Sequence, residues 1–268
     1  MITRYSLGVT LYQPECLSKY DNVIASATGR HGGTSPPPFS SLNVSYRVGD
    51  DPANVVRNRA RICAALDVRL DSAVAAQQIH GVNVVVVGES DRGRGALSWD
   101  DAIPDADALI TACEDLFLLM TFADCVPIVL YDPVRVALGL VHAGWKGTVG
   151  GIVGRAVDSM VRVFDSDPRQ IVAAIGPAVG PCCYEVGPDV IEVIRSSGLE
   201  SSALTTGDRV YFDLWAANRT QLLRAGLRES NVETSAMCPA CRTHLFFSHR
   251  GERGRTGRFA VVAGLRRR

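Results

Sequence analysis

The feature that most constrains this chain is a series of apolar segments between residues 116 and 142, separated by short polar breaks. Residues 116–120, 126–131 and 136–142 are apolar at nearly every position, and each run is too short for an ordinary helix. Apolar runs of this length are typical of strands that are buried within a sheet. Asp132-Pro133 provides a turn between the second and third runs. We therefore predict three consecutive buried strands in the middle of the chain.

Helix signals alternate with these strands. Asp51 can cap a helix, Pro52 suits its first turn, and apolar residues then recur at helical spacing as far as Leu66. A second helix is predicted over residues 148–164. Asp213 can cap a third helix, over residues 214–225, and Gly226 provides its stop. Further strands are expected at residues 82–87, 171–175, 246–247 and 259–262.

This order of elements predicts the fold class. We expect a single α+β domain over residues 1–268, in which mixed β-sheets are flanked by helices. No glycine fingerprint of a dinucleotide-binding fold follows a strand, which argues against that class. Residues 29–41, rich in glycine and proline, predict a surface loop or a flap.

Composition narrows the function classes. The 28 Lys and Arg residues balance the 28 Asp and Glu residues exactly in number, which argues against a nucleic-acid partner. No segment reaches the roughly 20 apolar residues that span a bilayer, and the first residues lack the apolar stretch of a secretory signal. We therefore expect a cytoplasmic protein without a membrane partner, in which the eight cysteines are thiols or metal ligands. A monomer is expected because no exposed amphipathic stripe demands a partner.

Three residues at the ends of predicted strands suggest a metal site. His80 precedes a strand, Cys125 stands at the mouth of another, and His142 ends a third. Two imidazoles and one thiolate form a three-ligand zinc set with an open fourth position, which is the pattern of a catalytic site. The alternative is that both histidines are structural and that Cys125 is a small buried apolar residue.

The local motifs around these residues carry a resemblance to a known family. They occur in a fixed order along the chain: Gln78-Ile79-His80-Gly81, Ala106-Asp107-Ala108, Ala123-Asp124-Cys125-Val126-Pro127, His142-Ala143-Gly144-Trp145, Gly180-Pro181-Cys182-Cys183-Tyr184, Phe246-Phe247-Ser248 and Thr256-Gly257-Arg258. With this set the chain resembles the YfiH-like laccase-domain family over nearly its whole length. Members of that family are described as polyphenol oxidases or as purine nucleoside phosphorylases.

The resemblance implies a ligand set and an activity. The metal ligands of the family fall on His80, Cys125 and His142, with zinc as the metal and copper as a reported substitute. The implied reaction is phosphorolysis of purine nucleosides (adenosine, inosine, guanosine and methylthioadenosine), with adenosine deamination as a further activity. The partners are then a purine nucleoside and phosphate. Lys146, where arginine is usual, and His249, where tyrosine is common, depart from the family pattern and could alter substrate choice.

Further residues receive expected roles in that reaction. Asp124 is expected to act as a general base or to orient His142. Arg47, Lys146, Arg258 and Asn43 are expected to bind substrate, with the three cations holding phosphate. The glycines from Gly144 to Gly151 either expose backbone N–H groups to an anion or allow close packing of a strand and a helix.

The remaining cysteines leave alternatives open. Cys238 and Cys241 form a CxxC pair, which is either structural, half of a second metal site or a disulfide. Cys182 and Cys183 are expected to line the pocket without binding metal.

Three rival functions are also considered. Copper-dependent phenol oxidation fits poorly, because a trinuclear copper centre needs about eight paired histidines and this chain has five scattered ones. Editing of cell-wall precursors by an amidase-type hydrolase would use Cys125 as nucleophile and His142 as base, and would survive chelation. A non-catalytic binding module would keep its role when Cys125 is replaced.

Overall fold

The computed structural model describes residues 1–267, and two six-stranded sheets and a three-stranded sheet form its framework. The first sheet has the order β1 (Ile2–Ser6), β2 (Val9–Gln13), β3 (Val23–Thr28), β15 (Phe259–Leu265), β7 (Phe117–Phe122) and β4 (Ala73–Ala75). The second has the order β14 (Val232–Thr234), β10 (Val172–Ile175), β8 (Val126–Asp132), β9 (Ala137–Ala143), β6 (Ala108–Thr111) and β5 (Val84–Val86). The small third sheet has the order β11 (Glu185–Val186), β13 (Arg209–Phe212) and β12 (Ala203–Thr206).

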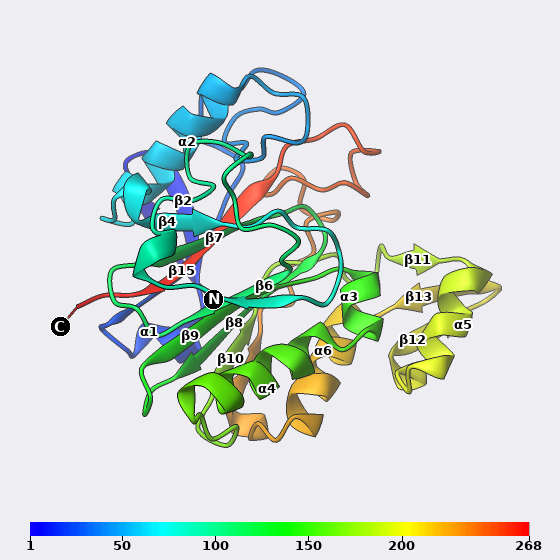
Figure 1. Cartoon of the computed structure of the whole chain (residues 1–268). Coiled ribbons are helices and arrows are strands. Elements are labelled where there is room, and N and C mark those ends of the chain that lie inside the picture. Colours follow the sequence, from blue (N-terminus) through cyan, green and yellow to red (C-terminus); the bar gives the residue numbers. More distant parts are fainter. Residues whose placement is uncertain (268) are drawn as a thin grey trace.

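The two large sheets pack face to face, and helices cover their outer faces (Figure 1). Helix α2 (Pro52–Ala65) lies against the first sheet, while α4 (Ile152–Phe164) and α6 (Leu214–Arg224) lie against the second. The result is a four-layer α/β/β/α arrangement of the α+β class, as predicted. The small sheet and α5 (Pro188–Ser196) project to one side of these layers (Figure 1).

Short helical segments connect these layers. The remaining α-helices are α1 (Glu15–Ser18) and α3 (Trp145–Val149), and single 3-10 turns occupy Leu70–Ser72, Glu89–Asp91, Glu200–Ser202 and Glu229–Asn231. Within residues 1–267, no helix combines the length and the apolar character needed to cross a membrane.

The central strands are apolar at nearly every position because both of their faces are buried. In β8, Val129 and Tyr131 point between the two sheets, whereas Ile128 and Leu130 point toward the helices of the outer layer. Strand β7 alternates in the same way between the inner core and the layer of α2. Side chains of successive strand residues point to opposite faces, so a continuous apolar run is what two covered faces require.

The helix starts follow the predicted caps. Asp51 accepts a hydrogen bond from the backbone N–H of Ala53 at 2.8 Å, and Asp213 accepts one from Ala216 at 3.0 Å. The helix predicted over residues 148–164 is wrong in one respect, because it is divided into α3 and α4. Gly151 lies between the two helices with φ +78°, a left-handed conformation that turns the chain and that glycine adopts without strain.

Residues 246–247 were predicted to form a strand, and that prediction is wrong. Phe246 and Phe247 lie in an irregular segment, although both are fully buried. The ring of Phe246 packs 4.8 Å from that of Tyr12 and 5.4 Å from that of Phe259, measured between centroids. Their apolar character therefore serves the core between the sheets rather than a ladder of backbone hydrogen bonds.

Candidate metal centre and its pocket

The structure brings the three predicted metal ligands together, two of them through the pairing of β8 with β9 and His80 from the loop between β4 and β5. Cys125 immediately precedes β8, and β8 pairs antiparallel with β9 so that Val126 faces Ala143 and Pro127 faces His142. The rings of His80 and His142 meet edge to face with centroids 4.8 Å apart. One possible ligand atom from each of His80, Cys125 and His142 lies within 4.8 Å of the others, so the group could hold a metal ion.

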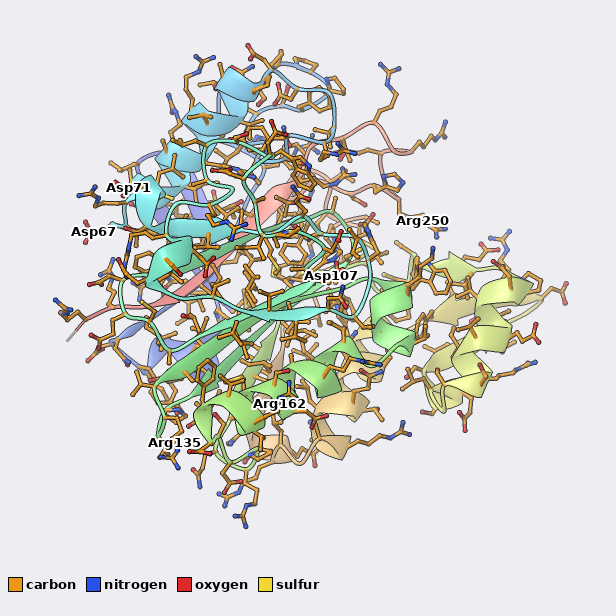
Figure 2. The ribbon with its side chains drawn as sticks, viewed as in Figure 1. Asp67, Asp71, Asp107, Arg135, Arg162 and Arg250 are labelled. Atoms are coloured by element: carbon orange, nitrogen blue, oxygen red, sulfur yellow. The ribbon has the colours of Figure 1, made fainter. Side chains whose placement is uncertain are left out.

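Asp107 fixes the orientation of this group. Its buried carboxylate accepts a hydrogen bond from Nδ1 of His142 at 2.8 Å, which leaves Nε2 as the free nitrogen of that ring. The same carboxylate accepts the backbone N–H groups of His80 at 3.0 Å and Gly81 at 2.7 Å. Figure 2 shows Asp107 in the interior of the molecule, whereas Asp67 and Arg135 lie at its periphery. A single carboxylate therefore positions two of the three ligands, as is common around metal-binding histidines.

The backbone at this centre has unusual conformations. His80 has φ +61° and Asp124 has φ +89°, both in the left-handed region that non-glycine residues rarely adopt. Gly144 approaches the centre so closely that an added Cβ would lie 3.1 Å from Sγ of Cys125 and 3.1 Å from Cδ2 of His80. Strained backbone of this kind persists where the surrounding structure determines it, and it occurs often at functional sites.

Electrostatics at the centre favours a thiolate. Burial alone raises the pKa of Cys125, but the neighbouring His142 and His80 outweigh burial and lower that pKa to about 6. For His142, burial lowers the pKa, while Cys125 and Asp107 outweigh it and raise the value to about 9. Thiolate and imidazole nitrogen are the donors that zinc and copper prefer, and three protein donors leave one position open. The donor set thus fits a transition-metal ion.

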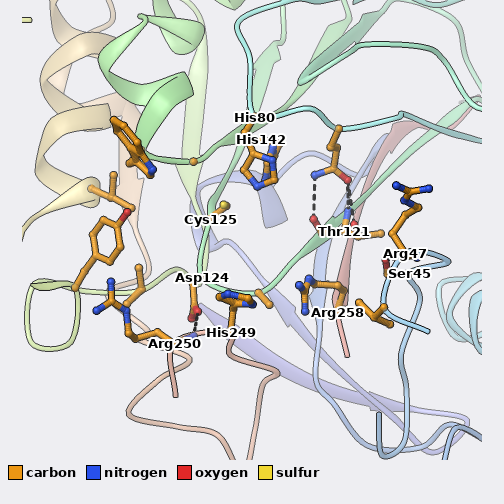
Figure 3. A pocket seen from close by; sticks show the side chains of 18 of the residues that line it. Ser45, Arg47, His80, Thr121, Asp124, Cys125, His142, His249, Arg250 and Arg258 are labelled. Carbon is orange, nitrogen blue, oxygen red and sulfur yellow. Dashed lines mark hydrogen bonds between the residues drawn. The ribbon is translucent and has the colours of Figure 1, made fainter. Parts of the chain in front are cut away.

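The three residues of the centre line a pocket of about 570 Å³, within the size range of small-molecule sites. Figure 3 shows His80, His142 and Cys125 at its centre, with Arg47 and Arg258 on one side and Arg250 on the other. Two arginine–aromatic pairs form part of the walls. The guanidinium of Arg47 lies 5.3 Å from the ring centroid of Trp99, and that of Arg250 lies 5.2 Å from the ring of Tyr184.

Asp124 lines the same pocket but does not contact His142. One of its oxygens accepts a hydrogen bond from the Ser248 hydroxyl at 2.7 Å, and the other accepts the backbone N–H of Arg250 at 2.6 Å. Burial raises the pKa of Asp124 despite these donors. The expectation that Asp124 orients His142 is wrong, because Asp107 occupies that position; its role as a general base stays a prediction.

The predicted substrate-binding residues divide into two groups. Arg47 and Arg258 line the pocket. Lys146 does not line it: this residue is exposed, and its ammonium lies 5.7 Å from the centroid of the Trp145 ring. Asn43 is fully buried behind the pocket, where its side chain donates to Asp50 and accepts the backbone N–H of Arg258 at 2.9 Å. The prediction of direct substrate contact by Asn43 is therefore wrong, because its polar atoms are already paired inside the protein.

The glycines near this helix start are explained by packing. A Cβ on Gly147 would lie 3.0 Å from the carbonyl oxygen of Gly81, and one on Gly150 would lie 2.6 Å from Cγ1 of Val82. Close approach of the segment that follows His80, rather than an anion, accounts for these two positions.

Sequence reasoning missed several residues of the site. Trp99 belongs to no recognised motif, while Tyr184 and Asp107 lie within family motifs that do not by themselves indicate their roles. Cys182 and Cys183 were expected to line the pocket, which is wrong, because they lie beside it in contact with Cys241.

Comparison with known proteins agrees with this geometry. Residues 24–266 match the family described as multi-copper polyphenol oxidoreductase laccase. The chain is 42% identical to purine nucleoside phosphorylase YlmD of Geobacillus stearothermophilus over 251 residues, which cover 92% of each chain. It is 34% identical to adenosine deaminase RL5 of an unknown prokaryotic organism, covering 79% of this chain and 82% of that protein. The crystal structure of Bacillus licheniformis hypothetical protein YfiH superposes with a TM-score of 0.92 at 39% identity, covering 98% of this chain and 99% of that one.

Fold and site together define a four-layer α+β protein with a His₂Cys centre in a ligand-sized pocket. The sequence match extends over nearly the full length of the chain, and it identifies a particular family within this class of proteins. The chain belongs to the multi-copper polyphenol oxidoreductase laccase family, in agreement with the resemblance of its motifs to YfiH-like proteins.

Proposed function

We propose that this protein is a zinc-dependent purine nucleoside phosphorylase. The observation that carries the proposal is the His₂Cys centre in a pocket whose walls present arginines and aromatic rings. The Geobacillus relative, a purine nucleoside phosphorylase with 42% identity over 92% of both chains, supplies the substrate class. His80, Cys125 and His142 would hold the metal.

Arg47 and Arg258 are assigned to the phosphate, since both lie on the same side of the centre (Figure 3). Arg258 is half-buried, and burial lowers the pKa of its guanidinium, although Cys125 and Asp124 act in the opposite direction. A guanidinium remains charged at neutral pH and can hold a phosphate through two parallel hydrogen bonds. The rings of Tyr184 and Trp145 provide apolar surface for the purine elsewhere in the pocket.

The reaction exchanges one bond for another at C1′ of the ribose. A phosphate oxygen forms a bond to C1′ while the bond from C1′ to the purine nitrogen breaks, and its electron pair goes to the purine. Phosphate loses one proton and the purine gains one, so the products are ribose 1-phosphate and the free base. The arginines hold phosphate in position for this attack, and orientation of two bound reactants contributes much of the rate enhancement.

Bound zinc would supply Lewis-acid polarisation of an oxygen ligand at the open coordination position. The protein's own residues perform the remaining tasks. Asp107 holds His142 and the backbone at His80 in place. Asp124 holds the segment that carries His249 and Arg250 against the pocket through its bonds to Ser248 and to the Arg250 backbone.

The test is a phosphate-dependent assay on inosine, paired with elemental analysis of the purified protein. We expect bound zinc and release of hypoxanthine together with ribose 1-phosphate; in Cys125→Ala the zinc of the His₂Cys centre and the release of both products should be lost. Cys113→Ser is the matched control, because Cys113 lies outside the pocket. A metal-loaded protein that releases no base from any purine nucleoside would overturn the proposal. Activity that survives complete removal of metal would favour a cysteine hydrolase instead.

Adenosine deamination is a second candidate function, favoured by the similarity to adenosine deaminase RL5. Here water replaces phosphate, and adenosine gives inosine and ammonia. The two reactions are separated by their products: phosphorolysis of adenosine gives adenine and requires phosphate, whereas deamination gives inosine without it. Arg258→Gln should depress the first reaction more than the second, because only the first needs the phosphate contact.

A further inference from the structure

Four cysteines meet beside the pocket, outside the His₂Cys centre. Cys182, Cys183, Cys238 and Cys241 place their sulfur atoms within 4.8 Å of one another. Sγ of Cys241 lies 3.5 Å from that of Cys182 and 3.3 Å from that of Cys183. All four are free thiols, and these distances are far longer than the roughly 2.05 Å of a disulfide bond.

We propose that these four residues form a second, structural metal site that binds zinc through four thiolates. In a tetrahedral site with Zn–S bonds of about 2.3 Å, neighbouring sulfurs lie about 3.8 Å apart. The observed sulfur–sulfur distances of 3.3 Å and 3.5 Å differ from that value by only a few tenths of an ångström. Four protein donors close the coordination sphere, which is the pattern of structural rather than catalytic zinc.

Local backbone structure prepares the ligands. Cys238 and Cys241 have the CxxC spacing of zinc-binding turns, and the N–H of Arg242 donates to the carbonyl of Pro239 at 3.0 Å to close that turn. Cys238 is buried, and its sulfur accepts the backbone N–H of Gly180 at 3.4 Å. A backbone donor of this kind stabilises a thiolate.

The opposite turn is equally tight. The N–H groups of Cys183 and Tyr184 both donate to the carbonyl of Gly180, each at 3.0 Å. A Cβ on Gly180 would lie 2.5 Å from the ring of Trp215 and 3.3 Å from Sγ of Cys182, so glycine is required for this approach. The two turns are also joined by backbone, since the N–H of Ala178 donates to the carbonyl of Met237 at 3.1 Å.

The position of the cluster indicates what the metal would do. The first turn leads directly into Tyr184, and the second precedes the segment that carries His249 and Arg250; all three residues line the pocket. A closed metal site here would therefore tie together two walls of the pocket, without itself touching substrate.

The decisive experiment counts metal in purified protein loaded with Zn²⁺ under reducing conditions. We expect two zinc ions per chain in the wild type, one in Cys125→Ala, one in Cys241→Ser and none in the double variant. Cys113→Ser is the matched control and should retain two. This design separates the proposal from the proposed function, because each centre is counted in the absence of the other.

Cobalt provides a spectroscopic check. In Cys125→Ala loaded with Co²⁺, a tetrathiolate site gives an intense sulfur-to-cobalt charge-transfer absorption together with the visible bands of tetrahedral Co²⁺. Both should be absent when Cys241→Ser is added. Titration of Co²⁺ to one equivalent, followed by displacement with Zn²⁺, would support the site.

Alkylation of the wild-type protein tests the proposal without any variant. Cys182 and Cys241 are exposed, so as free thiols they would react rapidly with iodoacetamide. We expect protection of Cys182 and Cys241 in the zinc-loaded protein and rapid labelling of both after chelation. A single zinc per chain that disappears entirely in Cys125→Ala, with rapid labelling of Cys182 and Cys241, would overturn the proposal. So would a disulfide among them, seen by mass spectrometry as the loss of two hydrogens in protein that binds no second metal.

Discussion

The molecule contains two cysteine-based clusters that differ in architecture. In the pocket, Cys125 and His142 are positioned by the paired strands β8 and β9, and the buried carboxylate of Asp107 holds His142 and the backbone of His80. Beside the pocket, four cysteines stand on two turns joined mainly by backbone contacts. The first cluster has three donors and lines the pocket, whereas the second has four donors and does not line it. Three donors that leave a coordination position open suit chemistry, while four donors on turns suit the tethering of loops.

The largest expected effect separates the two clusters by function. Cys125→Ala should reduce phosphorolysis by more than about 100-fold, since changes even to residues that merely support a ligand cost roughly 10–100-fold. The melting temperature should change little. Cys241→Ser should mainly affect stability rather than activity. We expect its melting temperature to fall by several degrees, since 1 kcal/mol corresponds to roughly 2–4 °C in a chain of this size. Part of the phosphorolysis activity should be retained. Thermal unfolding and initial rates, measured on the same preparations, check both.

The proposed division of roles between the two clusters is wrong if each variant shows the effect expected of the other. A Cys241→Ser protein that is thermally unchanged and inactive would place the four cysteines in the reaction rather than in the framework. Cys113→Ser, with both properties unchanged, excludes a general effect of thiol removal.

The next effect concerns the support of the first cluster alone. Asp107→Asn removes the charge that holds Nδ1 of His142, and we expect metal affinity at that centre to fall by about 10–100-fold. Metal at the four cysteines should be unaffected. Competition with a chromophoric chelator measures both affinities, and Asp100→Asn, at an exposed position, is the control. Equal affinity in Asp107→Asn and wild type would show that strand pairing alone positions the ligands.

The two clusters also differ in how far sequence could predict them. The strands at 126–131 and 136–142 could be predicted because nearly all of their residues are apolar, as burial of both faces requires. Cys125 and His142 stand at the ends of these strands, which made them candidate ligands. The role of Asp107 depends on the pairing of β6 with β9, which sets Ala108 opposite Val141. A local motif does not show which strands pair, so this role could not be predicted from the sequence.

The four-cysteine cluster was beyond local reasoning for a related reason. Its two pairs are separated by more than fifty residues, and each pair alone is an ambiguous motif. The separation of α3 from α4 was missed because a glycine pair can continue a helix or turn the chain, and the sequence does not show that Gly151 adopts the left-handed conformation. The buried Phe246 and Phe247 resembled a strand because apolar character reports burial, not hydrogen bonding.

A smaller effect is expected at the phosphate side of the pocket. Arg258→Lys keeps the charge but removes the planar fork that can grip phosphate at two points. We expect KM for phosphate to rise about 10-fold, with kcat and metal content nearly unchanged, because the contact is made in the ground state as well as in the transition state. Arg162→Lys, on the outer helix α4, is the control (Figure 2). A fall in kcat at unchanged KM would instead place Arg258 against charge that develops only during reaction.

The smallest expected effect tests how closely the backbone fits the first cluster. Gly144 has φ −72° and ψ 175°, a conformation open to alanine, so Gly144→Ala introduces no backbone strain. The added methyl would meet Cys125 and His80 at 3.1 Å, and these ligands would have to shift by a few tenths of an ångström. We expect a few-fold loss of metal affinity and of rate. Gly154→Ala is the matched control, because a Cβ at that helical position meets nothing within 4 Å; it should stabilise the fold by about 0.5–1 kcal/mol without altering metal binding. Equal metal affinity in both glycine variants would show that the ligands of the first cluster can move enough to accommodate the methyl group. The first cluster would then be less rigid than its strand pairing suggests, and it would differ less from the four cysteines.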